Sequence, residues 1–208
     1  MSHNQAIKRL GLFGGSFDPP HQAHITLATR AIEQLHLDRL LVIPTGDAWH
    51  KTRNLTLAPH RLAMTRLAFT ELPKVSVDSR EIDRHGPTYT MDTLEEVAQE
   101  FPNARLFLCV GGDQAKAFTT WHRWQDIVHR ATLAVAFRPE DKNAVHAIDH
   151  AQWHNGLPTG AIRLEMPRLT ISATDIRLQL AQSDTCPSAL PAGVCEYIKQ
   201  HSLYKNDR

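Results

Sequence analysis

A glycine-rich turn followed by two histidines is the sequence feature that most constrains this chain. The turn, GGSFDPPHQAH, covers residues 14–24; it follows the apolar run of residues 10–13 and precedes a helix-like segment at residues 25–35. A helix start offers unpaired N–H groups and a partial positive charge, and both favour phosphate. His21 and His24 are three residues apart, so their imidazoles face the same side of a helix and can reach one bound group. The turn therefore predicts a phosphate site for a nucleotide.

Strand-like and helix-like segments alternate along the chain. Strands are predicted at residues 9–13, 39–44, 74–78, 105–110, 133–137 and 161–165, and helices at residues 21–35, 59–72, 89–101, 174–181 and 191–201. Thr90 is expected to cap its helix, and the polar residues 140–160 are expected to form a mobile loop. Long crossovers favour a doubly wound α/β fold with a mostly parallel sheet covered on both faces. Ligands of such folds lie beyond the carboxyl ends of the strands, where the strand order reverses.

Composition favours one globular domain. We expect residues 1–208 to form it, with a helical C-terminal part at roughly residues 172–204. The net charge is +1 with 13 histidines counted as neutral, so no nucleic-acid partner is expected. Neither a signal peptide nor a membrane span is evident. The three cysteines form no CxxC pair and are odd in number, which predicts neither a disulfide framework nor a cysteine zinc site. We expect a reduced, cytoplasmic protein.

Two later segments could also bind phosphate. In ISATDIR, residues 171–177, Ser172 or Thr174 can cap a helix, and Arg177, expected on its first turn, can grip a phosphate with its fork of donors. An ordinary capped helix with one solvated arginine is the alternative. His50-Lys51, after the second predicted strand, could hold the phosphate of a second substrate, or be a solvated basic loop.

Residues after the fourth predicted strand could bind the rest of a nucleotide. Asp113 follows two glycines and is placed to accept a ribose hydroxyl, or to cap a helix. Trp121 and Trp124 could stack on a flat heterocycle, although paired aromatics at this spacing are more often part of a core. For the two histidines of the first turn, metal binding is the weaker interpretation because no HExxH or cysteine partner is present.

Together these segments resemble the HxGH nucleotidyltransferases and, among them, the bacterial nicotinate-nucleotide adenylyltransferases. The blocks that carry the resemblance are GLFGGSFDPPHQAH (11–24), His50-Lys51, GPTYTMDTL (86–94), FLCVGGDQAKAFTTWHRW (107–124), FRP (137–139), ISATDIR (171–177) and VCEYIKQHSLY (194–204). The resemblance implies a Rossmann-like nucleotidyltransferase fold. The implied reaction is adenylyl transfer from ATP to nicotinate mononucleotide, which gives nicotinate adenine dinucleotide and pyrophosphate in NAD biosynthesis. It implies Mg²⁺ bound through the ATP phosphates rather than by a protein site, and it leaves a homo-oligomer possible.

The resemblance also assigns residues to roles. The catalytic groups would be His21, His24, Lys51 and Arg177. The residues that bind ATP would be Gly14, Gly15, Ser16, Phe17, Gly111, Asp113, Ser172 and Thr174. The residues that bind nicotinate mononucleotide would be His50, Thr88, Tyr89, Thr90 and Trp121. In this assignment the two histidines contact the α- and β-phosphates, Arg177 holds the departing pyrophosphate, and Lys51 holds the mononucleotide phosphate.

Four positions depart from the family pattern. Ala23 replaces the glycine of HxGH, Ala173 replaces a serine, Trp49 replaces a proline before the His-Lys pair, and Thr88 replaces the serine of SYT. Alternatives within the superfamily are a nicotinamide-mononucleotide or a phosphopantetheine adenylyltransferase, and the Tyr89 and Trp121 blocks speak against the second. An alternative of another class is a non-catalytic nucleotide-binding sensor, which the four basic groups assigned to catalysis disfavour.

Overall fold

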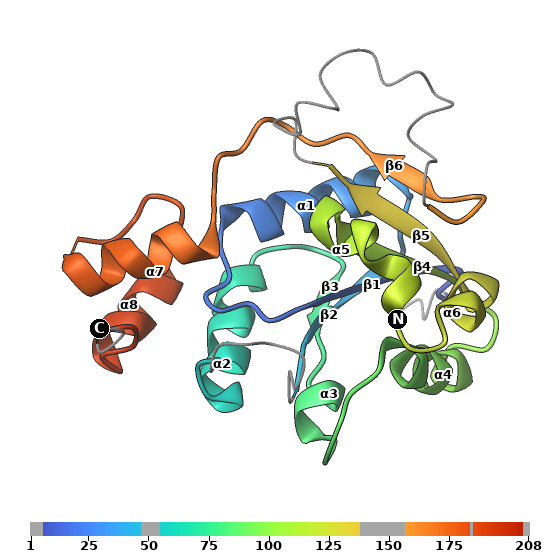
Figure 1. Ribbon diagram of the computed structural model, residues 1–208, viewed down its shortest axis with the longest axis horizontal. Helices are drawn as coiled ribbons and strands as arrows, with labels where there is room; N and C mark the ends of the chain where they lie inside the picture. The colour runs from blue at the N-terminus through green and yellow to red at the C-terminus, as the bar shows by residue number, and fades with distance from the viewer. Residues whose placement is uncertain (1–5, 47–54, 138–156, 184, 206–208) are drawn as a thin grey trace, which may run out of the picture.

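The described part of the chain forms a six-stranded sheet with helices on both faces (Figure 1). The computed structural model describes residues 6–46, 55–137, 157–183 and 185–205. The strands are β1 (Arg9–Gly15), β2 (Arg39–Pro44), β3 (Val75–Val77), β4 (Arg105–Gly111), β5 (Ala131–Ala136) and β6 (Ile162–Leu164). They lie in the order β3-β2-β1-β4-β5-β6, and each neighbouring pair is parallel. The predicted doubly wound parallel sheet is confirmed, and the strand order reverses between β1 and β4.

The helices cover the sheet in two groups. They are α1 (Gln22–Gln34), α2 (Ala58–Phe69), α3 (Arg80–Asp83), α4 (Thr90–Glu100), α5 (Gly112–Lys116), the 3₁₀ turn η1 (Phe118–Thr120), α6 (Trp124–Arg130), α7 (Ala173–Gln182) and α8 (Ala192–Gln200). Helices α1, α2, α7 and α8 share one apolar core, and α4 and α6 share the other. Figure 1 shows α7 and α8 together beyond one end of the sheet, beside α2.

Alternating side chains of the buried strands fill these two cores. In β1, Leu12 enters the core beneath α4 and α6, and the next residue, Phe13, enters the core beneath α1 and α2. In β4, Leu108 likewise enters the core beneath α4 and α6, and Cys109 enters the core beneath α1 and α2. Because both faces of the sheet are covered, the central strands are largely apolar, which explains why apolar runs rather than alternation marked them in the sequence.

Two predictions about helix starts are wrong. Thr90 is the first helical residue of α4, and Tyr89 takes the N-cap position with extended backbone angles and no side-chain cap bond. Arg177 is the fifth residue of α7, so it lies on the second turn rather than the first, because the helix already begins at Ala173. The short elements α3, α5 and η1, and α6, were not predicted; runs of three to seven residues are too short to show a helical period.

The predicted loop and the cysteines are considered next. The loop expected at residues 140–160 lies mostly outside the described residues, and residues 157–160 lead into β6. The expectation of a reduced chain without disulfides is wrong: Cys186 and Cys195 are paired as a disulfide, with Cα atoms 6.1 Å apart. The odd number of cysteines was misleading because the third, Cys109, is unpaired and buried in the core. Burial raises the pKa of the Cys109 thiol to about 12.

None of the helices in the described ranges has the length and apolar character that a membrane span requires.

Candidate active site

The two histidines of the first turn lie against each other at the start of α1. His21 is the N-cap and His24 is the third helical residue; their rings stack with centroids 3.8 Å apart and an interplanar angle of 22°. The main-chain N–H of His21 donates to His24 Nδ1 at 3.2 Å. In a neutral His24 ring the proton is then on Nε2, which leaves that nitrogen as a hydrogen-bond donor. The prediction that both imidazoles face one side is confirmed.

Aromatic side chains fix the orientation of His24. The ring of Phe17 is almost fully buried and meets the His24 ring edge to face, with centroids 5.0 Å apart. Phe13, at the end of β1, packs edge to face on Phe17 with centroids 5.4 Å apart. The backbone of Phe17 has a φ of 45°, in the left-handed region that non-glycine residues seldom occupy. The loop therefore takes a specific shape that its buried aromatic contacts hold in place.

Open space adjoins the ends of β1 and β4, the two strands at the reversal point. Gly14 is the second-last residue of β1, and Gly111 is the last residue of β4. A Cβ atom added to either glycine would meet no other atom within 4 Å. Gly111 is the N-cap of α5, so Asp113 lies in the first turn with its side chain exposed rather than capping the helix. This edge leaves room for a ligand where the fold predicts one.

Helix α7 brings the C-terminal block against the first loop. Ser172 caps α7, and its Oγ accepts a hydrogen bond from the Thr174 N–H at 3.2 Å. The Arg177 guanidinium donates to the carbonyl oxygen of Asp18 at 2.9 Å and to Thr174 Oγ1 at 3.2 Å. The first loop and the start of α7, each predicted from its own sequence pattern to bind phosphate, are therefore in direct contact.

A second pair of sequence blocks meets on the other side of the reversal point. Tyr89, just before α4, packs against the ring of His122 with centroids 4.5 Å apart and the ring planes tilted by 39°. Trp121, the neighbour of His122, packs on the buried Phe118 ring with centroids 5.4 Å apart. Thr88 and Thr90 flank Tyr89, so the blocks predicted to bind one substrate do come together. His122 was not predicted, because an exposed histidine in a WHRW run carries no distinctive pattern.

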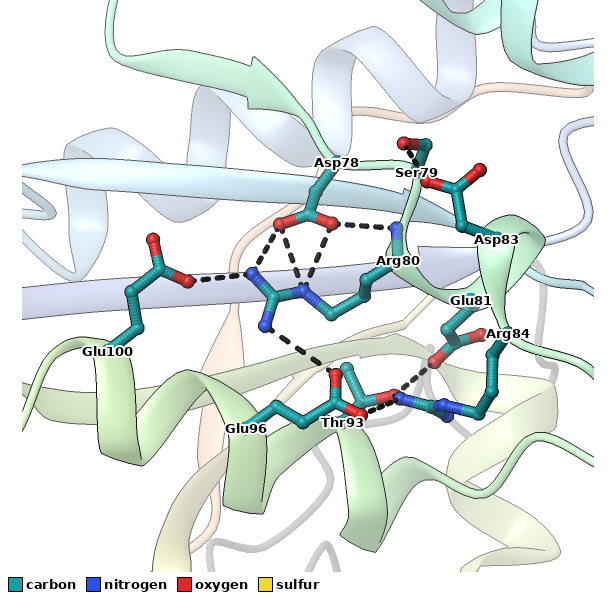
Figure 2. Close-up of polar contacts among 9 residues, drawn as sticks. All are labelled: Asp78, Ser79, Arg80, Glu81, Asp83, Arg84, Thr93, Glu96 and Glu100. Carbon is teal, nitrogen blue, oxygen red and sulfur yellow. Dashed lines mark hydrogen bonds and ion pairs between the residues drawn. The ribbon is translucent and has the colours of Figure 1, made fainter.

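A network of ion pairs fixes the chain between β3 and α4, where the Tyr89 block begins (Figure 2). The Arg80 guanidinium bonds both carboxylate oxygens of Asp78, and it also bonds Glu100 of α4 at 2.9 Å. Burial alone would raise the pKa of Asp78, but the hydrogen bonds from Arg80 outweigh it and lower that pKa. Arg84 likewise pairs with Glu96 at 2.8 Å. These pairs tie α3 to α4 and so fix the approach to Tyr89.

Glu81 lies buried beneath this network. It accepts a hydrogen bond from Thr93 Oγ1 at 2.8 Å, as Figure 2 shows, and burial raises its pKa in spite of that bond and of the nearby Arg84 charge. A Cβ at Gly46 would overlap the carbonyl oxygen of Glu81 and would lie 3.3 Å from Thr88 Oγ1. Only glycine fits at this contact, where the end of β2 meets the Thr88 side of the site. No local pattern predicted this packing.

Asp18 is a buried acid that sequence reasoning left without a role. Its Oδ1 accepts a hydrogen bond from the Tyr204 hydroxyl at 2.6 Å, and its Oδ2 accepts one from the Thr56 N–H at 3.2 Å. Burial, together with the Asp18 charge, raises the pKa of Tyr204. Both residues stand in blocks that carry the resemblance, which was the only signal available. The C-terminal tyrosine therefore anchors the first loop from inside.

The remaining predicted groups lie outside what the structure describes. Trp49, His50 and Lys51 fall in residues 47–54, so their predicted roles stay predictions. Within the described ranges, no three His, Cys, Asp or Glu side chains come together as a metal-binding group.

Comparison with known proteins agrees with this geometry. The sequence profile of the cytidylyltransferase-like family matches residues 12–179. A probable nicotinate-nucleotide adenylyltransferase of Albidiferax ferrireducens is 48% identical over 96% of this chain and 99% of its own. One of Methylibium petroleiphilum is 42% identical over 97% of this chain and 94% of its own.

A solved structure shares the fold. Plasmodium falciparum nicotinic acid mononucleotide adenylyltransferase, complexed with APC, superposes with a TM-score of 0.73 at 20% identity, covering 95% of this chain and 97% of that one. The complex of the same enzyme with NaAD superposes with a TM-score of 0.72, at the same sequence identity and with the same coverage of both chains. The likeness of fold and the near full-length sequence identity lead to one conclusion: the chain belongs to the nicotinate-nucleotide adenylyltransferases of the cytidylyltransferase-like family.

Proposed function

We propose that this chain transfers the adenylyl group of ATP to the 5′-phosphate of nicotinate mononucleotide, giving nicotinate adenine dinucleotide and pyrophosphate in NAD biosynthesis. The observation that carries the proposal is the hydrogen bond from Arg177 to the Asp18 carbonyl oxygen, which places a guanidinium beside the loop of His21 and His24. One cation and two imidazoles beside a helix start form a site for a polyphosphate. The names of the near full-length relatives supply the substrate pair.

The first loop and α7 would bind the triphosphate. His24 would donate from Nε2 to a phosphate oxygen, and His21, stacked on it, would bind the neighbouring phosphate. Arg177, with Thr174 and the Ser172 cap, would hold the pyrophosphate that leaves. The main chain of Gly14, Gly15, Ser16 and Phe17 would border the α-phosphate. Mg²⁺ would enter as part of MgATP, bound to the phosphates of this substrate.

The reversal point would hold the two nucleosides. On the adenosine side, Gly111 leaves open space at the end of β4, and the exposed Asp113 carboxylate is available to accept a ribose hydroxyl. On the pyridine side, Trp121 would stack on the nicotinate ring, with Thr88, Tyr89 and Thr90 lining the pocket. Donors aimed at the nicotinate carboxylate would select the acid over the amide, since a buried donor left unpaired costs affinity. His50 and Lys51 would hold the mononucleotide phosphate.

The chemistry needs no nucleophile from the protein. A phosphate monoester is largely dianionic at neutral pH, so one of its oxygens can attack the α-phosphorus of ATP directly. A new P–O bond forms, the bond between the α-phosphorus and its bridging oxygen breaks, and pyrophosphate leaves with the electron pair. The protein contributes alignment of the two phosphates and stabilisation of charge in the transition state.

The domain organisation, oligomeric state and cellular location are also proposals. We propose one domain over residues 1–208, since Ile176 and Leu180 of α7 and Val194 and Ile198 of α8 join the core that holds α1 and α2. A homo-oligomer and a cytoplasmic location stay predictions, and size-exclusion chromatography with light scattering would measure the first.

A substrate panel tests the proposed function. The protein is incubated with MgATP and, separately, nicotinate mononucleotide, nicotinamide mononucleotide and phosphopantetheine, and pyrophosphate release is followed. We expect release to be fastest with nicotinate mononucleotide, together with an equal amount of nicotinate adenine dinucleotide. Faster release with nicotinamide mononucleotide or phosphopantetheine would replace the proposed substrate, and ATP binding without release in any arm would favour a sensor.

A further inference from the structure

Arg61 is a buried cation that none of the proposed roles uses. It lies on the first turn of α2 and is 2% exposed. A guanidinium removed from water is costly unless its donors are satisfied. Arg61 Nε donates to the carbonyl oxygen of Thr56 at 2.8 Å, Nη1 to that of Ser16 at 3.1 Å, and Nη2 to that of Gly46 at 3.3 Å. All three acceptors are main-chain oxygens.

The three acceptors belong to three separate segments that border the site. Ser16 lies in the loop between β1 and α1, Gly46 follows the end of β2, and Thr56 precedes α2. A guanidinium is planar and its donors point in fixed directions, so three bonds from one group fix the spacing of the three segments. Gly46 and Thr56 also flank the stretch of sequence that carries His50 and Lys51.

The bond to Ser16 determines how the first loop presents its main chain. In a trans peptide the C=O and the following N–H point in opposite directions. Because the Ser16 carbonyl points at Arg61, the N–H of Phe17 points away from Arg61. Two residues later Asp18 is held by Tyr204 and by the Thr56 N–H, so the loop is anchored on both sides of Phe17. These hydrogen bonds flank Phe17, whose backbone lies in the left-handed region, and they act together with its buried aromatic contacts.

We propose that Arg61 is a positioning residue for adenylyl transfer. It does not touch the reacting atoms; it fixes the Ser16 carbonyl, and through it the direction of the Phe17 N–H and the placement of the loop that leads to His21. Displacing a phosphate-binding loop by about 1 Å is enough to cost on the order of a hundredfold in rate. The inference rests on the proposed function, so wild-type activity is measured first.

The test compares Arg61→Lys and Arg61→Ala with Arg66→Ala, a control that removes an exposed arginine from the same helix. Each variant is examined by circular dichroism below its unfolding temperature, and its competent sites are counted by calorimetric titration with a non-hydrolysable ATP analogue. We expect kcat per competent site to fall at least about tenfold in both Arg61 variants, with the analogue still bound. Added guanidinium ion should restore part of kcat in Arg61→Ala, and Arg66→Ala should match the wild type.

Three outcomes would overturn the inference. The first is a kcat per competent site within twofold of wild type. The second is a loss of activity that is fully explained by the loss of competent sites. The third is failure of both Arg61 variants to fold, and each of the three would mean that Arg61 does not position the loop for catalysis. An inactive wild-type protein would instead contradict the proposed function.

Discussion

The Arg177 guanidinium donates a hydrogen bond to the main-chain carbonyl oxygen of Asp18 at 2.9 Å, although 159 positions separate the two residues in the sequence. The same guanidinium contacts Thr174, one turn earlier in α7. The first loop and α7, the two segments proposed to bind the ATP phosphates, are therefore in direct contact.

Replacing Arg177 with lysine keeps the positive charge and removes the paired donors of the guanidinium. Lysine cannot contact the loop and a phosphate with the same paired donors, so we expect kcat to fall by about ten- to a hundredfold. Steady-state formation of nicotinate adenine dinucleotide measures the change. Arg30→Lys, on the exposed face of α1, is the control. A kcat within twofold of wild type for Arg177→Lys would remove Arg177 from the catalytic groups.

Trp121→Ala tests the pyridine side of the site. If the indole stacks on the nicotinate ring, its removal raises KM for nicotinate mononucleotide by about fivefold or more and leaves KM for ATP within about twofold, since a stacked aromatic pair contributes about 1 kcal/mol or more. Trp124→Ala is the matched control, because Trp124 packs on the same Phe118 ring. Equal changes in both variants would mean that Trp121 is only part of the core.

Tyr204→Phe removes the hydroxyl that donates to the buried Asp18 carboxylate. We expect the free energy of unfolding to fall by about 1–3 kcal/mol at pH 8, the cost of leaving such an acceptor unsatisfied. The pKa of Tyr204 is raised in the folded state, so its contribution is present below the unfolded value of about 10 and is lost as pH rises above it. Urea unfolding at pH 8 to 10.5 should show the difference shrinking. A difference independent of pH would contradict this account, and Tyr197→Phe is the control.

Glu81→Gln tests the buried acid beneath the network of Figure 2. Burial raises the folded-state pKa of Glu81, so its contribution to stability is present at acid pH and is lost as pH rises through that pKa. Glutamine keeps an oxygen that can accept from Thr93. We therefore expect the variant to be more stable than wild type at pH 7.5, with the difference vanishing on acidification, measured by urea unfolding. The control is Glu33→Gln, which changes an exposed side chain of α1. Destabilisation that is largest at neutral pH would show that Arg84 outweighs the burial.

Much of the fold could be predicted because its signals are local. Apolar runs marked the central strands of the sheet, and the glycine-rich turn marked the start of α1 at the reversal point. The turn also predicted that His21 and His24 act as a pair, since residues three apart on a helix share a face. The short helices α3 and α5 could not be predicted in this way, because one turn has no period.

The connections that hold the site could not be predicted from local pattern. Arg61 looks like any arginine on a polar helix turn, yet it bonds three main-chain carbonyls brought together by the fold. Tyr204 and Asp18 are 186 positions apart in the sequence. Such contacts depend on tertiary packing, which local sequence pattern does not show.

His24→Ala tests the central claim, that the first loop acts on the ATP phosphates in the transition state. Rapid-quench and steady-state rates of nicotinate adenine dinucleotide formation are compared with those of wild type and of His129→Ala, which removes an exposed histidine from α6. We predict that kcat falls at least about a hundredfold in His24→Ala, as for other lost transition-state donors, with KM for both substrates changed only a few fold. An effect confined to KM would mean that His24 supplies only uniform binding, and it would contradict the account.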